Sequence, residues 1–204
     1  MDWDIEALGK GWKTNTEIVK PINIKDMNEF LQLTMDIESY GGKDIYQQGA
    51  SSKQRGAGLF SLETGPDQGG MTRLTQVYKG LPKELTPSAL ERHFYQAARG
   101  DRSYDVKAKL HPSQQKYLMA AHIMMNKGGR KAYDKWVSGG KKQEDFLDWW
   151  ADFHWKGHGG DSTIRKNKID EVKINLDAYE KKRKKNTDTS FFFPDDRVMN
   201  EALG

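Results

Sequence analysis

The chain has 204 residues, of which 36% are hydrophobic and 30% charged, and its net charge is +4. This length suits one main domain with extensions, and the sequence holds no run of about 18 apolar residues that would cross a bilayer. Cysteine is absent, which excludes disulfides, thiolate metal sites and a cysteine nucleophile.

The first 22 residues show no sustained periodicity and include Gly9, Gly11 and Pro21, so we interpret residues 1–22 as an N-terminal arm or irregular lead-in. The acidic start of the chain lacks the basic and apolar regions of a secretory signal. We therefore expect the protein to reach any extracellular target by another route.

The apolar pattern predicts a first strong helix that starts near Asp26 and ends at Gly41-Gly42. Glu38 follows Leu31 by seven residues and Met35 by three, so helical spacing continues the apolar stripe into a carboxylate. A carboxyl group held against an apolar surface is favoured in its protonated form, which is what a general acid needs. The alternative is an exposed carboxylate at the frayed end of a helix.

The middle of the chain predicts a small hairpin region followed by helices. Residues 41–70 contain eight glycines and little periodicity, and we expect a hairpin near 43–65. Helical patterns follow at about 72–79, 87–98, 111–127 and 130–137, and another helix begins near Gln143. That last helix carries four aromatic residues at helical spacing, which we interpret first of all as a core stripe: Phe146, Trp149, Trp150 and Phe153.

After residue 160 the composition changes, and we treat 161–204 as a C-terminal extension. A narrow apolar seam suits docking on a partner or on the main domain and consists of Ile169, Val172, Leu176 and Tyr179. The block from Lys181 to Lys185 is entirely basic, which favours an anionic partner such as nucleic acid. Three adjacent aromatics, Phe191, Phe192 and Phe193, predict an anchor to another protein.

Two segments together resemble the signature of a known family. The string Ile37-Glu38-Ser39-Tyr40-Gly41-Gly42 is followed by Gln54-Arg55-Gly56-Ala57-Gly58-Leu59-Phe60-Ser61-Leu62-Glu63. The pair resembles the lysozyme-like lytic transglycosylases and goose-type lysozymes, in which Glu-Ser ends the catalytic helix and a Gly-Leu-Met/Phe-Gln-Ile-like segment follows. The resemblance covers 24–160, and it implies a mainly α (α+β lysozyme-like) domain at 23–160 with a small β-hairpin region between the two arms.

The resemblance also implies roles for particular residues. Glu38 would be the catalytic acid, with Ser39 able to hydrogen-bond and orient it, while glycines let the backbone approach a sugar closely. The segment 150–157, which includes His154 and Trp155, occupies the place where the family has an aromatic-Asn-Ala-Gly segment that borders the cleft. The implied substrate-binding residues are Ser39, Tyr40, Gly58, Leu59, Phe60, Glu63, His154 and Trp155.

The chain departs from the family pattern at three places. Ser61 replaces the usual Gln, His154 stands where Asn is common, and Tyr40-Gly41-Gly42 replaces an aromatic-Asn-Pro continuation. These departures affect the substrate contacts more than the acid, and they leave a decayed enzyme as an alternative.

The implied reaction is cleavage of the β-1,4 bond between N-acetylmuramic acid and N-acetylglucosamine, with no cofactor and no metal. An inverting hydrolase needs a second carboxylate about 6.5–9.5 Å from the first. Asp44, Glu63 and Asp67 are candidates by location, although each is also a typical solvated loop charge. Lytic transglycosylases of the resembled family instead work with one Glu and the substrate's own N-acetyl group, which we slightly favour.

Other functional classes have less support. His154 and His158 are four residues apart, as in helical metal pairs, but Gly157 lies between them and no His-Glu-x-x-His pattern exists. No Walker phosphate loop and no Gly-x-Ser-x-Gly occurs. A non-enzymatic structural or nucleic-acid-binding protein, based on Lys181 to Lys185 and the aromatic tail, is the main alternative.

A wall-cleaving domain between an arm and a docking tail resembles a phage particle component. We expect a virion protein of the tail or internal core that opens the host cell wall during genome entry. Its partners would be peptidoglycan glycan strands and, through 161–204, other virion proteins. A lysis enzyme released late in infection is the other phage alternative.

Overall fold

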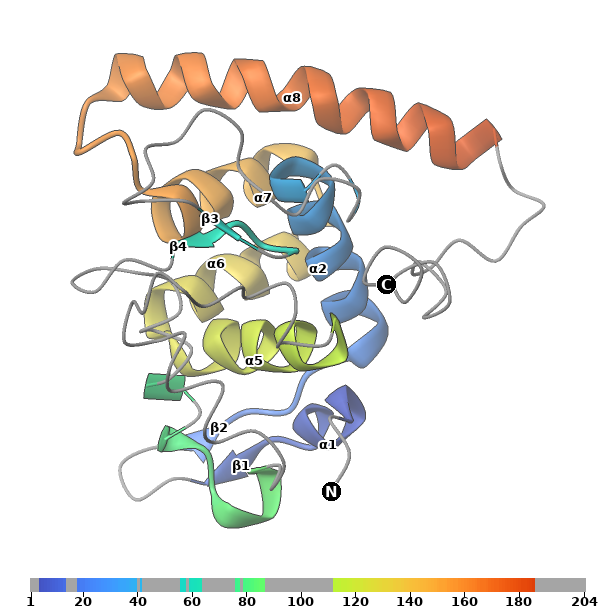
Figure 1. Cartoon of the computed structure of the whole chain (residues 1–204), viewed down its shortest axis with the longest axis vertical. Coiled ribbons are helices and arrows are strands. Elements are labelled where there is room, and N and C mark those ends of the chain that lie inside the picture. The colour runs from blue at the N-terminus through green and yellow to red at the C-terminus, as the bar shows by residue number, and fades with distance from the viewer. Residues whose placement is uncertain are drawn as a thin grey trace.

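The computed structural model describes residues 4–13, 18–39, 41, 56–57, 59–63, 76–77, 79–86 and 112–185, with only the backbone described at 56–57, 62–63 and 183–185. Mainly helical elements and two small antiparallel hairpins, β1–β2 and β3–β4, make up this part of the chain (Figure 1). The predicted mainly α class with a small hairpin is therefore confirmed. In chain order the elements are α1 (Ile5–Gly9), β1 (Trp12–Lys13), β2 (Ile18–Val19), α2 (Ile24–Ser39), β3 (Gly56–Ala57), β4 (Leu62–Glu63), 3-10 helix η1 (Lys83–Leu85), α5 (Pro112–Met125), α6 (Lys127–Ser138), α7 (Gln143–Trp149), π-helix η3 (Trp150–Trp155) and α8 (Ser162–Lys185).

Helix α2 begins at Ile24, slightly earlier than the predicted start near Asp26. Asn23 accepts a hydrogen bond from the Asp26 N–H at 3.2 Å, so Asn23 satisfies the free amide that a capping residue normally serves. Asp26 instead pairs with Lys141 at 2.8 Å. At the other end Gly41, in the left-handed conformation at φ 70°, donates its N–H to the Met35 carbonyl at 3.1 Å, as the predicted glycine stop requires.

The core is centred on Phe30 of α2. Its ring makes edge contacts, with centroids 4.5–5.1 Å apart, to four aromatic side chains of α6 and α7, namely Tyr133, Trp136, Phe146 and Trp149. Such edge-to-face pairs add directional attraction to the hydrophobic gain of burial. The predicted aromatic core stripe is confirmed at Phe146 and Trp149, which are buried.

The interpretation of residues 1–22 as an irregular arm needs correction. Residues 4–13 and 18–22 supply α1 and the β1–β2 hairpin, and Leu8, Trp12 and Val19 are buried in the common core. Arg130 on α6 donates to the backbone carbonyls that follow β2 at 3.1 and 3.2 Å. These elements are too short to show a helical or strand period in the sequence, which is why the pattern suggested no structure.

Helix α8 packs on the main domain and resolves an alternative that the sequence leaves open. Val172 and Leu176 are buried, with Ile169 packed against the same core, and α8 crosses α7 and the C-terminal end of α2 (Figure 1). In the part of the chain described, no helix combines the length and apolar character needed to cross a membrane. The predicted helix at 87–98 and the Phe191 to Phe193 segment lie outside the described residues.

Candidate active site

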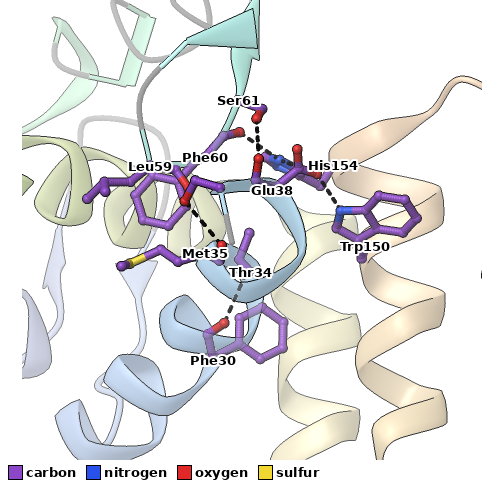
Figure 2. A network of polar contacts seen from close by, with 10 residues as sticks. Phe30, Thr34, Met35, Glu38, Leu59, Phe60, Ser61, Trp150 and His154 are labelled. Carbon is purple, nitrogen blue, oxygen red and sulfur yellow. Dashed lines mark hydrogen bonds and ion pairs between the residues drawn. The ribbon is translucent and has the colours of Figure 1, made fainter. Parts of the chain in front are cut away.

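The carboxyl group of Glu38 lies in the last turn of α2 and faces η3. Its Oε1 accepts a hydrogen bond from the Trp150 indole Nε1 at 2.6 Å, and the His154 Nε2 lies 3.4 Å from the same oxygen (Figure 2). The side chains of Glu38 and His154 are only 14% and 9% exposed. Glu38 is therefore neither the frayed, solvated carboxylate of the alternative interpretation nor part of a surface ion pair.

The segment η3 carries both side chains that contact the Glu38 carboxyl group, Trp150 and His154. Helix α7 changes to π-helical winding at Trp150, and this winding persists to Trp155. Lys156 closes the segment in the left-handed conformation and donates its N–H to the Ala151 carbonyl at 3.0 Å. In such i→i+5 winding, residues four and five apart lie on one face, and π segments occur frequently at functional sites.

The turn of the β3–β4 hairpin is attached to the same end of α2. Ser61 donates its hydroxyl hydrogen to the Glu38 backbone carbonyl at 2.7 Å, and His154 Nε2 lies 3.1 Å from the Phe60 carbonyl. Ser61 has φ 44°, an unusual conformation for a residue with a side chain. The two polar contacts hold this turn against the acid and η3, so Ser61, a departure from the family pattern, takes part in the architecture of the site.

A hydrogen bond from Ser39 attaches the hairpin turn to the end of α2. Its buried hydroxyl lies 2.8 Å from the Leu59 carbonyl and 3.1 Å from the Met35 carbonyl. The Leu59 N–H in turn donates to Gln115 Oε1 at 2.9 Å, so both backbone groups of this buried residue are satisfied. These contacts give Ser39 a role in joining helix and turn, and its role in orienting the carboxyl group stays a prediction.

The structure brings together several of the predicted site residues. Glu38, Ser39 and His154 meet the Leu59-Phe60 turn, and Trp155 stacks on Trp150 with centroids 5.7 Å apart. Leu59 and Phe60 are buried, so their side chains support the site from within the core. Outside the described residues lie Tyr40, Asp44, Gly58 and Asp67, together with the side chain of Glu63, whose backbone in β4 pairs with Gly56.

Trp150 is the residue of the candidate site that sequence reasoning did not single out, because, although it begins the segment 150–157 that resembles the cleft border, its place in the aromatic stripe indicated a core role. The sequence did contain a signal, because a buried indole N–H usually finds a hydrogen-bond acceptor, and the predicted helix ended in the carboxylate of Glu38.

The two histidines of the hypothetical metal pair have different partners in the structure. His158 Nε2 lies 3.5 Å from Asp152, while His154 contacts Glu38 and Phe60.

Comparison with known proteins identifies no relative, since no family model, curated protein or solved structure matches this chain. The argument for function therefore depends on the residues and geometry of the site. In the described ranges no three His, Cys, Asp or Glu side chains are grouped so that they could hold a metal ion. What the geometry offers is one secluded carboxyl group with an N–H donor on one oxygen and an imidazole beside it, an arrangement suited to proton transfer.

Proposed function

We propose that this chain cleaves peptidoglycan as a glycosidase in which Glu38 is the general acid and then the base. The observation that carries the proposal is the position of Glu38 at the end of α2, largely secluded and contacted by Trp150 and His154. The attachment of the Leu59-Phe60-Ser61 turn to the same helix end supports it, because the Glu-Ser and Gly-Leu-Phe segments carry the family resemblance.

The proposed chemistry begins with the protonated form of Glu38. Its proton passes to the oxygen of the β-1,4 bond as the bond to the N-acetylmuramic acid C1 breaks, and the carboxylate then accepts a proton from the attacking hydroxyl group. The substrate's own N-acetyl group would stabilise the positive charge at C1. A single carboxyl group suffices for this route, which leads to an anhydro-sugar product.

A single-carboxylate mechanism agrees with the described side chains that contact Glu38. Within the described part of the chain its carboxyl contacts Trp150 and His154, neither of which is a carboxylate. The hydrolase alternative needs a second carboxylate to activate water, and Asp44, Glu63 and Asp67 remain its candidates. The products of the reaction distinguish the two mechanisms.

The biological setting that we propose is a phage particle, in which the protein opens the host wall during genome entry. Because the apolar seam of α8 packs on the main domain, the part of 161–204 left for binding other virion proteins lies elsewhere. The basic end of α8 and the Phe191 to Phe193 segment are its candidates.

Digestion of purified cell walls tests the enzyme proposal, with Glu38→Gln as the key variant. We expect Glu38→Gln to lose at least about 100-fold in rate, because general acid–base catalysis contributes roughly that much or more. Glu144→Gln, which changes a glutamate that is 71% exposed, is the matched control and should retain full activity. Mass analysis of anhydro against reducing ends assigns the mechanism, and equal activity of wild type and Glu38→Gln would refute the role of Glu38.

A non-enzymatic role is the second candidate, favoured by one observation. Lys181 and Lys182 are exposed at the end of α8, where they begin the basic block. A nucleic-acid contact there would be strongly salt dependent and lost when Lys181 to Lys185 are neutralised. That result, together with no wall cleavage by the wild type, would replace the enzyme proposal.

A further inference from the structure

The two oxygens of the Glu38 carboxyl group have different surroundings. The Trp150 indole can only donate a hydrogen bond, and it donates to Oε1 at 2.6 Å. His154 Nε2 lies 3.1 Å from the Phe60 carbonyl, which can only accept, so this nitrogen carries the ring hydrogen. His154 Nε2 also lies 3.4 Å from Oε1, which is longer than a hydrogen bond. One N–H group, that of Trp150, therefore donates to Oε1, and the polar edge of the His154 ring lies beside the same oxygen.

We propose that Trp150 and His154 are positioning residues that keep Oε1 an acceptor and leave Oε2 as the oxygen that carries the transferable proton. A proton on Oε1 would occupy one of the acceptor sites of that oxygen and weaken the hydrogen bond from the indole N–H. A proton on Oε2 avoids this conflict. The role of Oε2 in catalysis rests on the proposed function, because Oε2 is then the oxygen that would face the glycosidic bond.

Ring contacts hold the Trp150 and His154 side chains in place beside Glu38. The Trp150 ring is buried and stacks on Trp155 at 6° between ring planes. The His154 ring stacks on Trp149 with centroids 5.9 Å apart. Side chains packed in this way lose little further freedom when the acid changes its charge, which is the preorganisation that proton transfer favours.

The Trp150 donor also suits the carboxylate that forms when the proton leaves Oε2. A hydrogen bond from an N–H group strengthens when its acceptor becomes charged. The titratable side chain that faces Glu38 from η3 is His154, and the nearby Asp152 is paired with Arg165 and His158. From the hairpin, the turn contributes the Phe60 carbonyl and the Ser61 hydroxyl to this corner.

Titration of the tryptophan indole signals by nuclear magnetic resonance tests the assignment without any substrate. The chain has six tryptophans, and the Trp150 signal is the one lost in Trp150→Phe. We expect its N–H signal to shift with pH in a single transition that disappears in Glu38→Gln. A Trp150 signal that is independent of Glu38 would overturn the proposal.

The pH profile of wall digestion provides the second measurement. In Trp150→Phe the carboxylate loses its hydrogen-bond donor, so the alkaline limb of the profile should move to higher pH. His154→Leu removes the polar contact beside Oε1 and should move the limb in the same direction by less, whereas His154→Gln keeps an N–H for the Phe60 carbonyl and should stay close to the wild type. Trp136→Phe is the matched control, because this buried indole N–H has no hydrogen-bond partner within the described structure.

The outcomes separate this proposal from the proposed function. An unchanged alkaline limb in both Trp150→Phe and His154→Leu, or an equal shift in Trp136→Phe, would refute the proposed positioning roles. If Trp150→Phe fails to fold, His154→Leu and the wild-type indole titration decide the question. A protein that shows the coupled titration but cleaves no wall would refute the enzyme role and leave the hydrogen-bond assignment intact.

Discussion

Trp150 and Trp155 lie five residues apart, yet their rings are parallel, with centroids 5.7 Å apart and 6° between the planes. In an α-helix only residues three or four apart are neighbours on the surface, whereas π winding brings residues five apart onto one face. The same winding presents the Trp150 N–H and the His154 ring to Glu38. The stacked pair and the side chains that contact the candidate acid are thus one structural unit.

Gly157→Ala should separate this stacked pair. A methyl group at Gly157 would lie 2.5–2.8 Å from atoms of the Trp155 ring, so the ring must move. We expect the near-ultraviolet circular dichroism of the coupled indoles to weaken. Gly159→Ala is the comparison, since its added methyl group meets nothing within 4 Å although φ is +55°. It should lower stability through backbone strain, by about 1 kcal/mol, and leave the spectrum unchanged.

Ser39→Ala should destabilise the protein by about 1–2 kcal/mol, because the buried Leu59 carbonyl loses its hydroxyl donor. Urea denaturation measures the change. Ser138→Ala is the matched control, as Ser138 is exposed and its hydroxyl contacts only the neighbouring turn, at Lys135 O. Equal effects of the two substitutions would show that the contact between α2 and the hairpin turn contributes nothing.

Arg165→Ala should loosen α8 from the segment that carries the site. The Arg165 guanidinium contacts Asp152 of η3 at 2.7 and 3.0 Å and Asp148 of α7 at 2.7 Å. Because these groups are partly exposed, we expect a loss of about 1 kcal/mol that shrinks at high salt. Arg165→Lys keeps the charge but not the planar fork, so it should rescue only part of the loss. Thermal melts that match those of Lys166→Ala, an exposed neighbour, would contradict this expectation.

Lys141 should make an alkaline contribution to stability. Hydrogen bonds to Asp26 and Glu29 raise the pKa of Lys141 above its ordinary value. A raised folded pKa means that the stabilisation is complete below the ordinary lysine pKa, about 10.4, and is lost as the pH rises through the folded value. We expect Lys141→Ala to be about 1 kcal/mol less stable than wild type near pH 8, with the gap closing above about pH 10.5.

Two variants control the Lys141 experiment. Lys142→Ala removes an exposed lysine beside it and should behave as wild type. Lys141→Gly loses the same ion pairs but relieves the left-handed backbone at φ 60°, so it should be more stable than Lys141→Ala. A stability gap for Lys141→Ala that stays constant up to pH 11 would show that the ion pairs are not its cause.

The helices near the site could be predicted because each presents a regular apolar stripe to one core. The stripe of α2 placed Glu38 at the helix end, and the seam of α8 identified Val172 and Leu176 as its buried face. The short elements α1, β1 and β2 could not be predicted, since five or fewer residues show no usable period. Their burial depends on Leu8, Trp12 and Val19 meeting a core formed by distant segments.

The sequence by itself determined that a carboxylate ends the first long helix and that a Gly-Leu-Phe turn follows it, because both are local patterns. Only the tertiary structure decided what surrounds that carboxylate. Glu38 and Trp150 are 112 positions apart, and they meet where α2, the hairpin turn and the π-helical segment η3 come together. Contacts over such a separation depend on packing between distant elements, so no local pattern encodes the Trp150 N–H that donates to Oε1 of Glu38.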